Sequence, residues 1–461
     1  MADTGTSFDV VVLGAGSGGY ACALRASQLG MSVALVERDK LGGTCLHYGC
    51  IPTKALLHAG EVADAVRGSA EFGVESQLLG VDLAAVNTYK DGVVASLYRG
   101  LQGLVKSRGI TIIEGSGTLT AAKTVSVAGS DYTGSSVVLA SGSYTRTLAG
   151  VDLDGHRVLG SSDALRLKEV PRRAVVLGGG VIGVEFASAW RSLGADVTVL
   201  EALPRLVASE DAASSKALER AFRKRGITVL TSTSFASLER TDVGVTVTAA
   251  SGDRFDADVL LVAVGRGPNT ADLGFEANGV TVERGFVVTD ERLHTRARDV
   301  YAVGDIVAGM QLAHRGFQHG IFVAEEIAGL APAPIDEAGI PRVTYSDPEI
   351  ASVGLTEEQA AARYGSDGVQ ALTYNLGGNG RSQILKTTGF VKLVRRNEGP
   401  VVGVHMVGAR VSELIGEAQL ITNWEAFPED VASLVHMHPT QNEALGEAHL
   451  ALAGKPLHAH T

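Results

Sequence analysis

Short apolar runs alternate with helical patterns at the start of the chain. Phe8–Leu13 is a valine-rich apolar run that predicts a strand, and Tyr20–Leu29 has the apolar spacing of a helix. A second apolar run, Ser32–Val36, predicts another strand and ends at Glu37. This order of strand, helix and strand is typical of an α/β domain with a parallel sheet.

A G-x-G-x-x-G fingerprint lies in the turn between the first predicted strand and its helix. Gly14, Gly16 and Gly19 permit a tight turn and bring the backbone close to a pyrophosphate at the N-terminus of the helix. Glu37, at the end of the second strand, is placed to accept hydrogen bonds from ribose hydroxyls. A glycine motif alone is weak evidence, but in this context it predicts dinucleotide binding.

The same pattern recurs near the middle of the chain. Its strands are Ala174–Leu177 and Asp196–Leu200, and its fingerprint and acid are Gly178, Gly180, Gly183 and Glu201. In both copies the acid follows the first glycine by 23 positions (37 minus 14, 201 minus 178). Two units predict two dinucleotides, and the alternative is a duplication in which one site has been lost. An acid at position 201 favours NAD, because it would repel the 2′-phosphate of NADP.

From Arg342 onward the pattern changes to strands followed by helices, which predicts an α+β domain with an antiparallel sheet. A glycine-rich stretch near 149–160 and the proline-rich and acidic segment 331–341 mark the boundaries. We therefore expect an α/β protein with two Rossmann-like domains and a C-terminal α+β domain. The predicted limits are 1–149 with 278–340 returning to it, 150–277, and 341–461. The tail after Lys455, with His458 and His460, is expected to be frayed.

Length and charge narrow the classes of function. A chain of 461 residues holds roughly three domains. A net charge of −11 without a basic run argues against a nucleic-acid partner. No apolar run is long enough for a membrane span, and the N-terminus has no pattern of a secretory signal. We expect a reducing, cytoplasmic setting, in which a close cysteine pair is more often catalytic than structural.

Two of the three cysteines, Cys45 and Cys50, lie in the segment Leu41–Lys54 with four residues between them. They lack the four-ligand set of a zinc site, so no metal is predicted. In a regular helix, positions five apart point about 140° away from each other, so a bridge would distort the turn. Gly49 and Pro52 make such a distortion easier. Strained short-loop disulfides are reducible, which favours a redox pair. The alternative is a pair of buried, inert thiols.

Other candidate residues follow predicted strands or lie near the C-terminus. Ser141-Gly142 and Gly265-Arg266 form turns where a cofactor could lie against the backbone, and Asp305 lies at the carboxyl end of a short apolar strand. His438 has Glu443 five positions later, beyond a proline. A carboxylate at this distance could hold the tautomer of the imidazole and raise its basicity. A purely structural role is the alternative for this pair.

Five motifs in order resemble those of the pyridine nucleotide–disulfide oxidoreductases. They are the first G-x-G-x-x-G, Gly-Gly-Thr-Cys-x4-Cys-Ile-Pro-Thr-Lys, the second G-x-G-x-x-G, Thr-x4-Val-Tyr-Ala-x-Gly-Asp and His-Pro-Thr-x2-Glu. The resemblance covers almost the whole chain and is greatest to the dihydrolipoamide dehydrogenases of that family. It implies a flavoenzyme that oxidises protein-bound dihydrolipoamide with NAD.

The resemblance implies a role for each candidate residue. Lys54 would lie near the flavin ring, where a cation favours negative charge on reduced flavin, with Glu185 as its partner. The other residues implied to contact FAD are Gly14, Gly16, Gly19, Glu37, Gly43, Thr44, Gly117, Ser141, Gly142, Asp305 and Ala313. Those implied to bind NAD are Gly178, Gly180, Gly183, Glu201, Gly265 and Arg266.

The same resemblance implies the catalytic residues and the partners. Cys45 and Cys50 would form the redox disulfide, in which the first exchanges with substrate and the second interacts with the flavin. His438, held by Glu443, would be the acid–base group and would come from the partner subunit. A homodimer with the last domain as its interface is therefore expected. The expected protein partners are the lipoyl domains of the acyltransferase subunits of 2-oxo acid dehydrogenase complexes.

The sequence leaves two alternative functions. One is an NAD(P)H-dependent reductase of another small disulfide, of the mycothiol or glutathione type. The glutathione type usually uses NADP and carries arginines near the position of Glu201. The other is an assembly subunit without chemistry, which would leave the cysteine and histidine motifs unexplained. Mercuric reductases and large thioredoxin reductases need a further C-terminal redox pair, and no cysteine follows Cys50.

Overall fold

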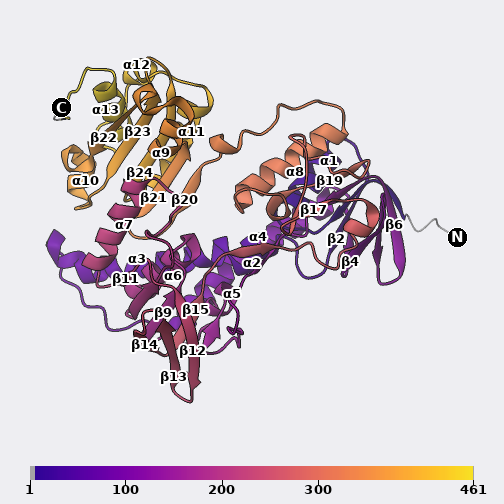
Figure 1. The fold of residues 1–461 in the computed structure, drawn as a ribbon, viewed down its shortest axis with the longest axis horizontal. Helices are drawn as coiled ribbons and strands as arrows, with labels where there is room; N and C mark the ends of the chain where they lie inside the picture. Colours follow the sequence, from indigo (N-terminus) through magenta and orange to yellow (C-terminus); the bar gives the residue numbers. More distant parts are fainter. Residues whose placement is uncertain (1–5, 460–461) are drawn as a thin grey trace.

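The computed structural model describes residues 6–459, which form three parts around sheets (Figure 1). The first part lies at the right of Figure 1, the second at the lower centre, and the C-terminal part at the upper left. The expected fold class, two Rossmann-like sheets followed by an α+β domain, is confirmed. The exact domain limits stay predictions.

The first sheet is built mainly of parallel strands around β1. Val10, Val11 and Val12 of β1 are fully buried, as expected for a strand covered on both faces. Helix α1 (Ser17–Gln28) connects β1 to β2 and packs against α8 (Ala313–Ile327). The strand order is β3 (Thr111–Glu114), β2 (Val33–Glu37), β1 (Ser7–Leu13), β6 (Ser130–Leu139), β5 (Thr124–Val127) and β4 (Gly117–Ala121). Strand β19 (Val300–Ala302), from the segment predicted to return to this domain, also pairs with β6.

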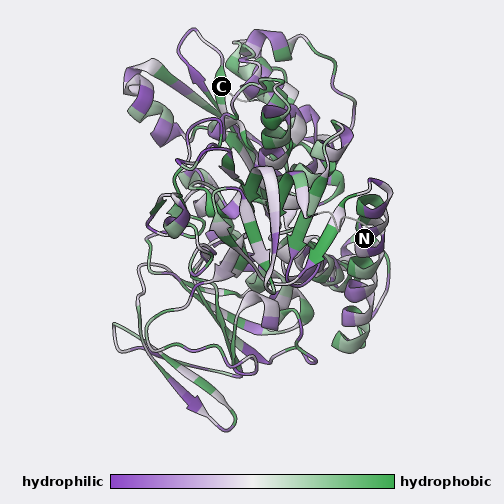
Figure 2. Cartoon of the chain, turned by 90° about the vertical axis from the view of Figure 1, so that its right-hand side faces the viewer, coloured by the Kyte–Doolittle hydropathy of each residue, from purple (hydrophilic) through white to green (hydrophobic). Residues whose placement is uncertain are grey.

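The second sheet repeats this arrangement with α6 (Val181–Leu193) after its central strand. Its order is β11 (Thr228–Leu230), β10 (Asp196–Leu200), β9 (Arg173–Leu177), β15 (Val259–Val262) and β8 (Val158–Leu159), all parallel. Helix α7 (Ala212–Lys224) precedes β11, and an antiparallel sheet of β12 (Phe235–Thr241), β13 (Gly244–Ala249) and β14 (Arg254–Ala257) precedes β15. Figure 2 shows hydrophobic residues on strands in the middle of the molecule, whereas the strand arrow in the lowest hairpin ends in hydrophilic residues.

The C-terminal part is an antiparallel sheet covered by helices. Its strand order is β20 (Arg342–Thr344), β21 (Glu349–Gly354), β24 (Val401–Gly408), β23 (Phe390–Arg396) and β22 (Val369–Asn375). The helices are α9 (Glu357–Tyr364), α10 (Gly380–Ile384), α11 (Ile415–Asn423), α12 (Pro428–Ala432) and α13 (Glu443–Leu452). The core between sheet and helices includes Val353, Leu393, Ala418 and Leu445.

The cysteine segment forms two helices rather than one. Helix α2 (Gly43–Tyr48) ends before Gly49, and α3 (Cys50–Gly68) begins directly after it. In the sequence, the apolar spacing of a helix covers only Ala55–Arg67, so α3 begins five residues earlier than this pattern predicts. Pro52 is compatible with this start, because the first turn of a helix needs no backbone N–H at that position. The long helix α4 (Leu83–Ser107) follows.

Two predictions near the C-terminus are wrong in part. The sequence pattern predicts one helix over roughly Val411–Trp424, but the structure has a short 3-10 turn, Val411–Glu413, followed by α11. The tail was expected to be frayed, but Glu447 holds His458 in place. The backbone N–H of His458 donates to the Glu447 carboxylate at 3.0 Å, and Nδ1 of His458 lies 2.9 Å from the other carboxylate oxygen. His460 lies outside the described residues. Within residues 6–459, no helix has the length and apolar character needed to cross a membrane.

Candidate active site

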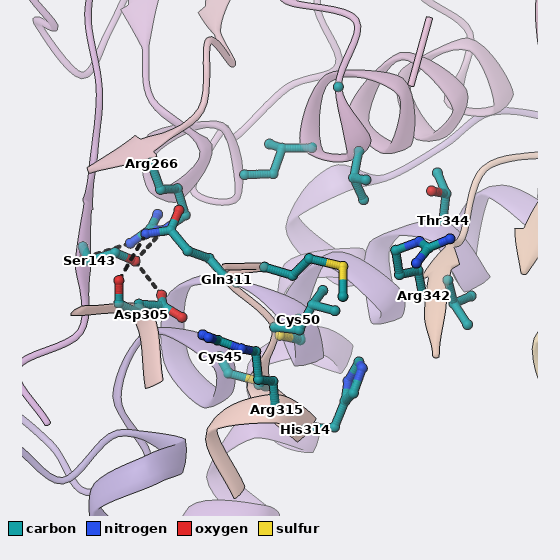
Figure 3. Close-up of a pocket in the computed structure, with 18 of the residues that line it drawn as sticks. Cys45, Cys50, Ser143, Arg266, Asp305, Gln311, His314, Arg315, Arg342 and Thr344 are labelled. Carbon is teal, nitrogen blue, oxygen red and sulfur yellow. Dashed lines mark hydrogen bonds between the residues drawn. The ribbon is translucent and has the colours of Figure 1, made fainter. Parts of the chain in front are cut away.

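One large cavity, of about 1530 Å³, lies between the three parts. Its lining includes both cysteines of the redox segment, Arg266 and Asp305 (Figure 3). Lys54 also lines it. Of the other residues predicted to contact a cofactor, the lining contains Gly16, Thr44, Gly142, Gly178, Gly180, Glu185, Glu201, Gly265 and Ala313. Tyr345 and Ser412 of the C-terminal part also line the cavity, so the fold brings residues from all three parts to one space.

The first glycine fingerprint forms a tight turn that opens onto this cavity. Gly14 has φ +105°, and a Cβ there would lie 2.3 Å from the carbonyl oxygen of Ala140. A Cβ on Gly19 would lie 1.8 Å from the carbonyl oxygen of Gly14. Gly16 has open space instead, and as the N-cap of α1 it has no side-chain cap. The first backbone N–H groups of α1 can therefore bind a phosphate.

The acid of each unit is hydrogen-bonded to its own glycine turn. Glu37 accepts from the backbone N–H of Ala15 at 2.8 Å through one carboxylate oxygen. Glu201 accepts from the backbone N–H of Gly179 in the same way, and its other oxygen accepts from Leu203 at 2.7 Å. Gly180 has no atom near the position of a Cβ, as at Gly16. The donors and the open turns fit two dinucleotides, of which FAD would occupy the first turn and NAD the second.

The two cysteines border the cavity as free thiols. The break at Gly49, with φ −142° and ψ −108°, separates α2 from α3 and replaces the regular helix that would turn the two side chains apart. The hydrogen bond from Cys45 lowers the pKa of Cys50 to about 7, and the ammonium of Lys54 acts in the same direction against burial. The same hydrogen bond and burial raise the pKa of Cys45. The negative charge of the reduced pair therefore lies on Cys50.

Lys54 and Glu185 form the ion pair that the resemblance implied. The Nζ atom of Lys54 lies 2.9 Å and 2.8 Å from the two carboxylate oxygens of Glu185. Burial alone would lower the pKa of Lys54, but the Glu185 carboxylate outweighs it and holds the pKa above its ordinary value. Lys54 is therefore a fixed positive charge on the same helix as Cys50.

Ser143 is a candidate residue that the sequence interpretation missed. Its hydroxyl donates to the Asp305 carboxylate and accepts from Nε of Arg266 at 2.7 Å (Figure 3). It begins β7 (Ser143–Thr145), which pairs with β16 (Arg266–Pro268) where the chain passes between the two Rossmann-like parts. Its position after Ser141-Gly142 was the only sign in the sequence. Ser143 joins a residue predicted for NAD to one predicted for FAD.

His438 and Glu443 do not line the cavity in this chain. Nδ1 of His438 lies 2.7 Å from Oε1 of Glu443, and the backbone N–H of Thr440 donates to the other oxygen at 2.7 Å. The His438 side chain is 77% exposed, so the pair faces outward. The predicted imidazole–carboxylate contact is present, but within a single chain it lies apart from the cysteines.

Some predicted cofactor residues also lie behind the cavity wall. Gly117 packs against Leu13 and Val36 of the first sheet, where a Cβ would be 2.6 Å from Leu13. The Ser141 hydroxyl donates to the carbonyl oxygen of Asn269 at 2.6 Å. The others outside the lining are Gly14, Gly19, Glu37, Gly43 and Gly183. These positions shape the turns and the sheet on which the cavity is built.

Comparisons with known proteins agree with this arrangement. Residues 8–320 match the family described as pyridine nucleotide-disulphide oxidoreductase, and residues 340–449 match the dimerisation domain of that family. The chain belongs to the pyridine nucleotide-disulphide oxidoreductases. The dimerisation domain supports a homodimer and contains both His438 and Glu443.

Relatives of known name cover the whole chain. Dihydrolipoyl dehydrogenase of Bacillus subtilis is 37% identical over 98% of this chain and 99% of its own length. Dihydrolipoyl dehydrogenase 3 of Pseudomonas aeruginosa is 40% identical over 98% of this chain and 99% of its own. The crystal structure of LpdA from Mycobacterium tuberculosis superposes with a TM-score of 0.90 at 27% identity, covering 96% of this chain and 99% of LpdA.

Proposed function

We propose that this protein is a dihydrolipoyl dehydrogenase that oxidises protein-bound dihydrolipoamide and reduces NAD. The reaction converts one dithiol and NAD⁺ into a cyclic disulfide, NADH and one proton. The observation that carries the proposal is the shared cavity, in which Cys45 and Cys50 face two dinucleotide turns. The full-length similarity to dihydrolipoyl dehydrogenases supports this choice of substrate.

The dithiol half of the reaction is an exchange at the Cys45–Cys50 disulfide. A substrate thiolate attacks the sulfur of Cys45, the bond between the two cysteines breaks, and Cys50 leaves as a thiolate. The second substrate thiolate then attacks the substrate sulfur of this mixed disulfide and releases Cys45. The lowered pKa of Cys50 makes it the better leaving group, which fixes the direction of attack toward Cys45.

The proton of the attacking thiol needs a base, because a thiol is a poor nucleophile at neutral pH. His438 of the second subunit is proposed as that base, with Glu443 holding the ring through Nδ1 so that Nε2 receives the proton. The exposure of this pair and its place in the dimerisation domain support a role across the dimer interface. Each active site would then contain residues of both subunits.

When bound, FAD supplies the two-electron carrier between the reduced cysteines and NAD. The residues of this chain hold the charges around it. Lys54 stabilises negative charge on Cys50, and the turns at Gly16 and Gly180 offer backbone N–H groups to phosphates. Glu201 is expected to bind the ribose of NAD and to repel the 2′-phosphate of NADP. We further propose lipoyl domains of 2-oxo acid dehydrogenase complexes as partners, in a reducing cytoplasmic setting.

A turnover assay of the flavin-loaded enzyme tests this function. We expect dihydrolipoamide to reduce NAD, with NADP at least about tenfold less effective in kcat/KM. Cys50→Ser should abolish turnover without loss of FAD. Glu201→Ser should reduce the ratio of kcat/KM with NAD to kcat/KM with NADP. The protein would instead be a reductase of small disulfides if it reduced a glutathione- or mycothiol-type disulfide with NADPH and had no activity on dihydrolipoamide.

A further inference from the structure

Tyr345 is the third residue in contact with the Lys54–Glu185 pair. Its backbone N–H donates to Oε1 of Glu185 at 2.9 Å, the same oxygen that accepts from Lys54. Its ring centroid lies 4.6 Å from Nζ of Lys54. A cation this close to an aromatic face is attracted by the ring quadrupole. The tyrosine therefore contacts both members of the ion pair through different groups.

The ring of Tyr345 is suited to hold a cation. Burial raises the pKa of the phenol in spite of the nearby ammonium, so the ring is neutral at physiological pH. Tyr345 lines the cavity, as do Cys50 and Lys54. It follows β20, so it reaches the redox residues from the C-terminal part, whereas Lys54 and Glu185 come from the helices α3 and α6.

The segment that carries Tyr345 is fixed to α6 one turn beyond Glu185. The backbone N–H of Asp347 donates to the Ser188 hydroxyl at 2.9 Å. Arg225 donates to the carbonyl oxygen of Asp347 at 3.0 Å and to the same hydroxyl at 2.8 Å. These bonds hold the backbone of residues 345–347 against α6, so the ring has a defined place relative to the ion pair.

We propose that Tyr345 is a positioning residue of the redox centre, whose ring holds the Lys54 ammonium where it stabilises the Cys50 thiolate. The inference deepens the proposed function and rests on it for the role of the reduced cysteine pair. Through Tyr345, the first residues of the dimerisation domain contribute to the electrostatic environment of the two cysteines. Without the ring, Lys54 keeps its carboxylate partner but loses the surface that fixes its direction.

Tyr345→Leu and Tyr345→Phe form the test, because phenylalanine keeps the ring and leucine removes it. The flavin-loaded variants are reduced with dithiothreitol under anaerobic conditions, and the long-wavelength thiolate–flavin absorbance is titrated with pH. We expect Tyr345→Leu to raise the titration midpoint by about 0.5–1 pH unit, a roughly two- to fivefold smaller thiolate population at pH 7. Tyr345→Phe should stay within about 0.2 unit of the wild type.

Alkylation of the reduced cysteines by iodoacetamide over the same pH range is a second readout that does not depend on the flavin band. Equal midpoints in Tyr345→Leu and the wild type would overturn the proposal, and so would equal shifts in the leucine and phenylalanine variants. Because dithiothreitol is the reductant, the result is independent of lipoamide turnover. If the wild-type enzyme did not oxidise dihydrolipoamide, the proposed function would be overturned. The comparison of the Tyr345 variants with the wild type would still be valid.

Discussion

Lys54 and Glu185 form an ion pair at 2.8 and 2.9 Å although 131 positions separate them in the chain. The pair joins α3, which begins at Cys50, to α6, which follows the second glycine fingerprint. Glu185 is almost fully buried, and Lys54 is partly exposed toward the cavity. The helix of the redox cysteines is thereby tied to the helix of the second nucleotide turn.

Removal of the negative charge in Glu185→Gln should lower the pKa of both Lys54 and Cys50. Burial then acts on Lys54 without its main compensation, so the pKa of the ammonium falls. The Glu185 carboxylate also raises the pKa of Cys50, so while Lys54 stays protonated the removal of that carboxylate lowers the pKa of Cys50 and the thiolate persists to lower pH. The thiolate–flavin titration of the reduced enzyme measures this change. Glu61→Gln, at an exposed position of α3, is the control, and an unchanged midpoint in Glu185→Gln would contradict the account.

The reduced wild-type enzyme should itself titrate near neutral pH. The pKa of Cys50 is lowered to about 7, first by the hydrogen bond from Cys45 and further by Lys54. A lowered thiol pKa means that the thiolate is present above pH 7 and is lost as the pH falls through 7. The long-wavelength absorbance of the dithiothreitol-reduced enzyme should therefore fade on acidification with a midpoint near pH 7. A midpoint near 9, the ordinary value for a thiol, would contradict the assignment of the charge to Cys50.

His438→Gln should slow dihydrolipoamide oxidation strongly. Loss of a general base costs about 10²- to 10⁴-fold in rate, and the effect should appear in kcat/KM for the dithiol. His458→Gln is a matched control. His458 also contacts a glutamate of α13, Glu447, at 2.9 Å, but it lies outside the predicted motif. Steady-state kinetics with dihydrolipoamide and NAD distinguish the two. Equal losses in both variants would indicate a structural effect on α13.

Two inactive variants should complement each other if His438 acts across the dimer. When Cys45→Ser and His438→Gln subunits are mixed and allowed to exchange, half of the dimers contain one of each. Each such dimer keeps one intact site made of Cys45 from one subunit and His438 from the other. The mixture should recover about a quarter of the wild-type activity. No recovery after verified subunit exchange would place both residues of a site in the same subunit.

The glycine turns and their acids were predictable from sequence because they are local. Each fingerprint and its acid lie within one strand–helix–strand unit, so spacing alone brings Glu37 to Ala15 and Glu201 to Gly179. The valine-rich strands were predictable for the same reason. The start of the helix at Cys50 was harder to predict, because the break at Gly49 allows α3 to begin before the apolar pattern does.

Contacts between distant segments could not be derived from pattern. Ser143 meets Asp305 across 162 positions, and Tyr345 meets Glu185 across 160. Neither residue type carries a distinctive motif, and the contacts arise only when the parts pack together. The docking of His458 on Glu447 also depends on tertiary packing, which overrides the usual fraying of a terminus. The separation of His438 from the cysteines within one chain also depends on how the parts of the chain pack, so it could not be predicted from spacing.

An anaerobic titration of the flavin-loaded protein with dihydrolipoamide and then with NAD tests electron transfer from the dithiol through the flavin to NAD. We expect a long-wavelength band that grows with dithiol and disappears when NAD is added, with an equivalent amount of NADH formed. A protein that is unchanged by dihydrolipoamide but is bleached by NADPH would contradict the account.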